Sequence, residues 1–299
     1  MLIVDDFSEG TTFDLIEPTV PSVPFVFSAP HSGTTYPKSL LSRARLDRLT
    51  LRRSEDTFVD ELFAGVPSLG APLMRAHFPR VFLDLNRCSS EIDPSMFDAP
   101  PPLPMQADSP RVASGLGVIA RIVGEGQEIY ASHLPAAEAE DRLTRFYHPY
   151  HNALSAQLAT HVEHFGAAVL VDCHSMPSGA IRHDVGDPNR IDVVLGDRYG
   201  TSCSGMLSEE FARLLRDQGL TVGRNRPYAG GFITERYGHP PMIHAIQIEI
   251  NRALYMNEAT FERNAGFDAL RLALMATSAR LIDWFMAHDA GVDWQQAAE

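Results

Sequence analysis

Short apolar runs alternate with polar, turn-rich connections along the first third of the chain. The runs "PFVFSAPHSG" (24–33) and "RVFLDLNR" (80–87) each predict a short strand that ends in polar residues, and a helical pattern lies between them near 54–64. The stretch "APPPLPMQADSP" cannot form a helix or a central strand, because proline lacks an N–H donor and fixes φ. We therefore expect a surface loop or a lid at about 91–113.

Helical and strand patterns alternate through the rest of the chain. Apolar side chains recur at three- and four-residue steps from 136 to about 164, which predicts a long helix with Pro149 as a candidate kink. Strand patterns follow at "AAVLVDCHS", "RIDVVLGD", "LTVGRN" and "HAIQIEINRALYM", with helices near 203–217 and from about 260 to 287. Because "AAVLV" has no polar interruption, it is typical of a strand buried on both faces. The pattern predicts an α/β layered domain.

Composition narrows the function classes. With 299 residues, 44% of them hydrophobic, the chain can bury the core of one enzyme-sized domain, so we expect a single domain over 1–299. A formal charge of −13 disfavours nucleic acids and anionic membrane surfaces, which would be repelled at long range. The N-terminal "MLIVDDFSEG" has no targeting pattern and no apolar run reaches membrane-spanning length, which predicts a cytoplasmic protein. Three cysteines without CxxC spacing suggest neither disulfides nor a cysteine zinc site.

Polar side chains stand where the predicted strands end. "SAPHSG" brings in His31, "DLNR" ends on Arg87 and "DCHS" brings in His174. In open α/β sheets, ligands bind outside the carboxyl ends of the strands, so these side chains are candidates for a shared crevice. Glu249 lies inside the apolar alternation of "IQIEIN", where a buried carboxylate needs a partner, a metal or a proton. An arginine such as Arg252 is one such partner.

Two histidines and one carboxylate with an open fourth position form a common catalytic zinc site. In "RRSEDTFVDELF", Glu55 and Asp56 are both candidates for the carboxylate. Both could instead be acids in the first turn of a helix capped by Ser54. Periodicity does not choose between these readings. Taken singly, a histidine such as His31 in a glycine-containing turn is more often a hydrogen-bonded loop residue than a ligand.

Seven separate motifs, in order, resemble the N-formylglutamate amidohydrolase family, whose members are also called N-formylglutamate deformylases. They are "PFVFSAPHSGTTYP", "EDTFVDEL", "RVFLDLNR", "YHPYHNAL", "VDCHSMPS", "PYAGGFITERYG" and "IQIEINRALYM", and they cover the chain from about residue 22 to the C-terminal helix. The family is distantly similar to zinc carboxypeptidases and aspartoacylase-type deacylases. The resemblance implies a three-layer α/β/α fold with a mixed, mostly parallel sheet. It also implies hydrolysis of N-formyl-L-glutamate to formate and L-glutamate, in histidine breakdown.

The resemblance also implies roles for individual residues. The ligands of a Zn²⁺ ion, or of another divalent transition metal, would be His31, Asp56 and His174, with Glu249 as the catalytic carboxylate. Substrate binding would fall to a further set: Asn86, Arg87, Gly230, Gly231, Thr234 and Arg236. The small anionic substrate carries two carboxylates, of which Arg87 would bind one and Arg236 or Arg226 the other.

One departure from the relatives concerns the metal motif. They carry His-x-x-Glu, whereas Thr34 stands three residues after His31, so the carboxylate ligand must come from elsewhere. Alternatives are a related amidohydrolase or carboxypeptidase-like enzyme acting on another N-acyl amino acid, and a non-catalytic protein that binds an acidic metabolite. A serine hydrolase built on Ser32 or Ser175 is disfavoured, because neither serine lies in a G-x-S-x-G turn.

Overall fold

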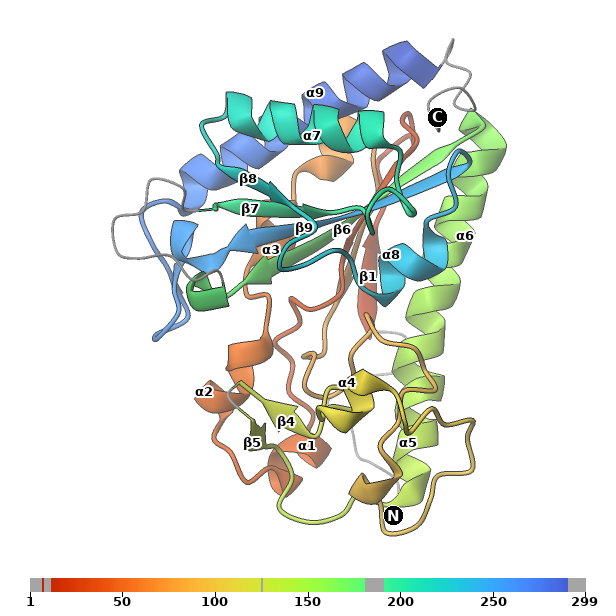
Figure 1. The fold of residues 1–299 in the computed structure, drawn as a ribbon, viewed down its shortest axis with the longest axis vertical. Helices are drawn as coiled ribbons and strands as arrows, with labels where there is room; N and C mark the ends of the chain where they lie inside the picture. Colours follow the sequence, from red (N-terminus) through yellow and green to blue (C-terminus); the bar gives the residue numbers. More distant parts are fainter. Residues whose placement is uncertain (1–6, 8–11, 125, 181–190, 290–299) are drawn as a thin grey trace. The chain divides into compact units, whose positions relative to one another are not determined.

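The structure is a computed structural model that describes residues 7, 12–124, 126–180 and 191–289 (Figure 1). The N-terminal stretch interpreted above lies outside the described residues, apart from Phe7. The chain forms two compact units, the first within residues 1–14, 30–57 and 75–154, and the second within residues 15–29, 58–74 and 155–299. The single domain over 1–299 stays a prediction.

A central sheet of seven strands runs through the described part of the chain in the order β1-β3-β2-β6-β9-β7-β8. Strand β6 is parallel to both β2 and β9, and β7 is parallel to β8 but antiparallel to β9. The expected mixed, mostly parallel sheet is therefore confirmed. The strands are β1 (Phe13–Ile16), β2 (Phe25–Ala29), β3 (Leu73–Ala76), β6 (Ala168–Met176), β7 (Val193–Gly196), β8 (Val222–Arg224) and β9 (Ile243–Asn251).

Both faces of β6 are covered, as its apolar sequence predicts. Alternate side chains of β6, such as Val171 and Cys173, enter an apolar core with α3 (Val59–Leu62), α7 (Gly205–Asp217) and α9 (Phe267–Asp289). Helix α8 (Phe232–Tyr237) packs on β6 and β9, and Figure 1 shows it on the side of the sheet away from α7 and α9. Side chains alternate between the faces of a strand, so Asp172 and His174 point away from the α7–α9 side. This is the expected α/β architecture.

The remaining elements of the second unit are short. They are η2 (Val66–Leu69), η5 (Ser178–Ala180), η6 (Arg252–Leu254), and a two-stranded ribbon of β10 (Met256–Asn257) and β11 (Glu262–Arg263). The C-terminal helix begins at Phe267 rather than near 260, because the ribbon takes up the residues before it.

The first unit consists mainly of helices and turns. Its elements are α1 (Lys38–Arg43), α2 (Arg48–Leu51), η1 (Arg52–Ser54), η3 (Pro94–Met96), α4 (Pro110–Ala113), the ribbon β4 (Ile122–Val123) with β5 (Gln127–Glu128), and α5 (Ala136–Arg142). A π-helical turn (Leu143–Tyr147) joins α5 to α6 (His148–Phe165), so the predicted long helix is present. The turn lies just before Pro149, which cannot donate the usual helical hydrogen bond.

Two local predictions were wrong. Residues 80–87 form turns rather than a strand, and the N–H groups of Phe82 and Leu83 both donate to the carbonyl of Pro79. Its apolar residues Val81, Phe82 and Leu83 are all buried, but they lie in turns rather than in a sheet. The helix expected near 54–64 begins only at Val59, so the acids before it are not in a first helical turn.

The proline-rich stretch has no helix or strand between η3 and α4 among the described residues, and its role as a lid stays a prediction. No helix in the described part of the chain is both long enough and apolar enough to cross a membrane.

Candidate metal centre

His31 follows β2 and is buried in the first unit. Its Nε2 atom lies 2.8 Å from Oδ1 of Asp84, and its Nδ1 atom lies 3.4 Å from Oδ2 of Asp56. Because an ionised carboxylate only accepts hydrogen bonds, Nε2 donates to Asp84, and a neutral His31 ring therefore has its lone pair on Nδ1. A separation of 3.4 Å is long for a hydrogen bond, but two ligands of a tetrahedral zinc ion, each about 2.1 Å from it, lie that far apart.

Glu55 and Asp56, the two acids left open by the sequence, have different surroundings. The buried Glu55 carboxylate accepts hydrogen bonds from Tyr36 Oη (2.5 Å), Arg52 Nε (2.9 Å) and Thr57 Oγ1 (2.9 Å). Burial, followed by the nearby Glu55 charge, raises the pKa of Tyr36, which keeps that phenol a donor. Asp56 instead faces His31, and its own N–H donates to the carbonyl of His31 at 3.0 Å. These contacts favour Asp56 over Glu55 as a ligand.

Asp84 was not singled out from the sequence. Its buried carboxylate also accepts from Arg80 Nε and from the backbone N–H of Asn86, both at 2.8 Å. Burial raises the pKa of Asp84, but Arg80, Arg87 and His31 lower it further, so it lies well below the ordinary value. The group stays ionised. The signal that could have found it is its place two residues before Asn86, in the same short turn as Arg87.

The turn that carries Asn86 and Arg87 is held from α6 and its preceding turn. Tyr147 Oη donates to the carbonyl of Arg87 at 2.7 Å, and His151 Nε2 donates to the carbonyl of Leu85 at 3.0 Å. The Arg87 guanidinium donates from Nε to the carbonyl of Leu116 (2.9 Å) and from Nη1 to that of Asn86 (2.8 Å). Its Nη2 group makes no hydrogen bond to any described residue, which suits it for an incoming carboxylate.

In the second unit, His174 lies on β6 beside β9. Its Nε2 atom lies 2.8 Å from Oδ2 of Asp172, two residues earlier on the same face, so its Nδ1 also keeps the lone pair. The parallel register sets His174 beside Glu249 and Asp172 beside Gln247. Gln247 Nε2 donates to Oε1 of the buried Glu249 at 2.7 Å, which orients that carboxylate.

The glycine-rich segment packs closely against the last residue of β7, Gly196. A Cβ on Gly196 would lie 2.6 Å from the backbone of Ala229 and Gly230, so glycine permits this close approach. The buried Thr234 hydroxyl donates to the carbonyl of Gly231 at 2.9 Å and therefore stabilises the start of α8.

Arg236 differs in environment from the other predicted binding residues. It lies on the exposed side of α8, with its guanidinium above the rings of Phe232 (5.8 Å) and Tyr237 (5.5 Å). Thr234 and Arg236 both belong to helix α8.

His31 and Asp56 in the first unit and His174 in the second are all buried, and their side chains together could hold a metal ion. Two imidazole nitrogens and a carboxylate oxygen are a ligand set used by catalytic zinc and by other divalent transition metals. The group fits a metal site.

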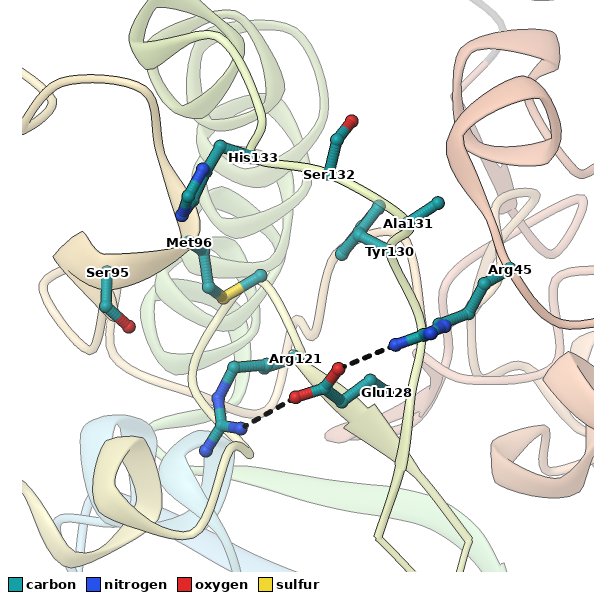
Figure 2. A pocket seen from close by; sticks show the side chains of 9 residues that line it. All are labelled: Arg45, Ser95, Met96, Arg121, Glu128, Tyr130, Ala131, Ser132 and His133. Atoms are coloured by element: carbon teal, nitrogen blue, oxygen red, sulfur yellow. Dashed lines mark hydrogen bonds and ion pairs between the residues drawn. The ribbon is translucent and has the colours of Figure 1, made fainter.

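A cavity of about 410 Å³ in the first unit lies apart from these predicted residues. Figure 2 shows Glu128 between two arginines, with Arg45 Nη1 at 2.9 Å and Arg121 Nη1 at 3.9 Å. Arg121 is also 3.2 Å from Asp93. The arginine charges are therefore matched by carboxylates, and none of the predicted site residues lines the cavity.

Comparison with known proteins gives consistent matches over most of the chain. A family model described as N-formylglutamate amidohydrolase matches residues 23–256. An N-formylglutamate deformylase from Pseudomonas aeruginosa is 29% identical over 268 residues, which are 88% of this chain and 94% of the relative. One from Pseudomonas putida is 32% identical over 245 residues, 79% of this chain and 83% of the relative. The crystal structure of N-formylglutamate amidohydrolase from Ralstonia eutropha JMP134 is 38% identical with a TM-score of 0.86, covering 92% of this chain and 99% of that one.

Proposed function

The chain belongs to the N-formylglutamate amidohydrolase family, and we propose that it hydrolyses N-formyl-L-glutamate to formate and L-glutamate with a divalent metal held by His31, Asp56 and His174. The observation that carries the metal assignment is the buried group of two imidazoles and one carboxylate. In both histidines an aspartate takes Nε2, which leaves Nδ1 as the ligand atom. Zinc as the ion, a cytoplasmic location and a place in histidine breakdown stay predictions.

A divalent metal held by His31, Asp56 and His174 would lower the pKa of a bound water molecule toward about 7 and would polarise a carbonyl. Glu249 accepts the proton of the water that attacks the formyl carbon. It then donates that proton to the amide nitrogen as the C–N bond breaks, so that L-glutamate leaves as the amine and formate remains. Gln247 supports this role, because its hydrogen bond fixes one carboxylate oxygen of Glu249.

Arg87 binds one of the two substrate carboxylates, and Asn86 lies beside it on the same turn. Two guanidinium N–H groups of Arg87 already donate to backbone carbonyls, so the side chain is oriented before substrate arrives. The segment that contains Gly230, Gly231, Thr234 and Arg236 binds the other end of the substrate. Gly230 has a φ of 118°, a conformation that favours glycine.

The direct test measures formate release from N-formyl-L-glutamate by the metal-loaded protein. Because the second carboxylate is expected to be bound by charge-assisted hydrogen bonds, kcat/KM for N-formyl-L-glutamine should be lower by about 30-fold or more. N-acetyl-L-glutamate and N-formyl-L-methionine complete the panel. Preference for an uncharged side chain would replace the proposed substrate with another N-acyl amino acid, and no cleavage of any member would reject the proposal.

A further inference from the structure

The Asp84 carboxylate contacts three side chains, those of His31, Arg80 and Arg87, and one backbone N–H group. Its Oδ1 atom accepts from the ring of His31 and from the backbone N–H of Asn86, both at 2.8 Å. Its Oδ2 atom accepts from Arg80 Nε at 2.8 Å and lies 3.8 Å from Arg87 Nε. One buried carboxylate thus contacts a proposed metal ligand and the turn that carries the proposed substrate arginine.

We propose that Asp84 is a positioning residue that orients the metal ligand His31 and the substrate-binding turn of Asn86 and Arg87 together. The inference rests on the proposed function, because it takes His31 as a ligand and Arg87 as the group that binds a substrate carboxylate. Through Oδ1, Asp84 fixes both the ring orientation and the protonated nitrogen of His31. Through the Asn86 N–H and the charge on Oδ2, it fixes where the Arg87 guanidinium can lie.

Asp172 is a suitable comparison for Asp84, because it contacts a proposed metal ligand but not the substrate-binding turn. Its Oδ2 atom contacts His174 at 2.8 Å, while Oδ1 is buried without a hydrogen-bond partner among the described residues. Asp172 therefore orients a metal ligand without contacting a substrate arginine. Both aspartates accept a hydrogen bond from Nε2 of a histidine, but of the two only Asp84 also contacts the turn of Asn86 and Arg87.

The experiment compares Asp84→Asn with Asp172→Asn in two measurements. Zn²⁺ affinity, measured by competition with a chromophoric chelator, is expected to fall about 10- to 100-fold in both variants. KM for N-formyl-L-glutamate, measured at saturating metal, is expected to rise about tenfold in Asp84→Asn and to stay within about twofold in Asp172→Asn. Equal KM values in the two variants would overturn the link to Arg87, and unchanged metal affinity in Asp84→Asn would overturn the link to His31.

Two further readouts keep the test decisive if Asp84→Asn does not fold. In the metal-free wild-type protein, ¹⁵N NMR of labelled histidines should show a proton on Nε2 of His31, and a ring protonated at Nδ1 alone would overturn the proposal. Arg80→Gln removes one partner of Oδ2 and leaves Oδ1 untouched, so it should raise KM several-fold with metal affinity unchanged; the reverse pattern counts against the proposal. A wild type that cleaves no N-formyl-L-glutamate would refute the proposed function, whereas the metal and NMR readouts would still report on Asp84 and His31.

Discussion

Nδ1 of His31 faces Oδ2 of Asp56 across 3.4 Å, and both side chains are almost wholly buried. In a neutral ring whose Nε2 donates to Asp84, two electron-pair donors face each other away from bulk water. A cation bound between them would remove that repulsion. Substitutions that remove one of the ligands should therefore weaken metal binding.

His31→Asn and His174→Asn are each expected to weaken Zn²⁺ binding by at least about 100-fold, because each removes a ligand of the ion. Equilibrium dialysis with metal analysis measures the loss. The matched control is His133→Asn, which changes a histidine that lines the cavity of Figure 2 and should bind the metal as the wild type does. Wild-type affinity in His174→Asn would remove that residue from the ligand set.

Exchanging each of the adjacent acids for its amide separates their roles. Asp56→Asn should lose metal affinity and remain folded. Glu55→Gln should keep the metal, but its free energy of unfolding should fall by about 2 kcal/mol, because Arg52 loses a charged partner. Urea denaturation and metal titration on both variants measure these effects, and the opposite pattern would make Glu55 the ligand.

Glu249→Gln is expected to lower kcat about 1,000-fold at unchanged metal content, because the amide cannot carry the proton from water to the leaving amine. Steady-state formate release measures the effect. Glu262→Gln, on the exposed strand β11, serves as the control. If Glu249→Gln keeps more than about a tenth of the wild-type kcat, Glu249 is a structural partner of Gln247 rather than the proton carrier.

Arg87→Lys should lower kcat/KM about 30-fold, mostly through KM. Lysine offers a point charge where the planar guanidinium makes several directed hydrogen bonds, a loss of about 2 kcal/mol. Arg145→Lys is the control, since Arg145 is a more exposed arginine that pairs with Asp141 one helical turn away. An equal loss for N-formyl-L-glutamate and for analogues that lack either one of its carboxylates, such as N-formyl-γ-aminobutyrate and N-formyl-L-glutamine, would argue against the proposed clamp.

His244 provides a prediction about pH. It is buried on β9 beside the ring of Phe285, and its Nδ1 accepts from the N–H of Ser204 at 3.2 Å. Burial lowers the pKa of His244 from its ordinary 6.5 to about 4. Between these values the unfolded chain binds a proton that the folded chain does not, so stability is full above pH 6.5 and falls as the pH drops toward 4.

The expected decrease in the free energy of unfolding from pH 7 to pH 5 is about 2 kcal/mol for this group. His244→Asn keeps an acceptor for Ser204 but does not titrate, so its stability should decrease by that much less over the same range. Urea denaturation of both proteins at the two pH values measures the difference. Parallel pH profiles would show that His244 does not titrate as expected.

The central strands could be predicted from the sequence because their apolar character is local. Strand β6 begins with four apolar residues, β9 places isoleucines at alternate positions from Ile246 to Ile250, and both strands are buried. Residues 80–87 have a similar composition but fold into turns, because burial alone does not distinguish a strand from a buried turn. The polar residues after Phe25–Ala29 and within β6 were informative because strand ends are where ligands bind in such sheets.

The contacts that support the site residues could not be predicted from local sequence patterns, because many of them join residues that are far apart in the sequence. Asp84 and His31 are 53 positions apart, so nothing near either residue indicates their bond. Glu55 and Asp56 are equivalent by pattern, and only the donors around Glu55 distinguish them. The position of Thr234 in a buried helical turn likewise depends on the backbone of Gly231.

The pairing of β6 with β9 also determines which genetic changes the protein can tolerate. His174 stands opposite Glu249 because the two strands pair residue by residue. Deleting one codon early in β6 would move Ser175 opposite Glu249 and turn the imidazole toward the apolar side of the sheet. A single in-frame deletion there would therefore be as damaging as replacing the histidine. A deletion in the loops at either end would not by itself turn the side chains of β6 to the other face.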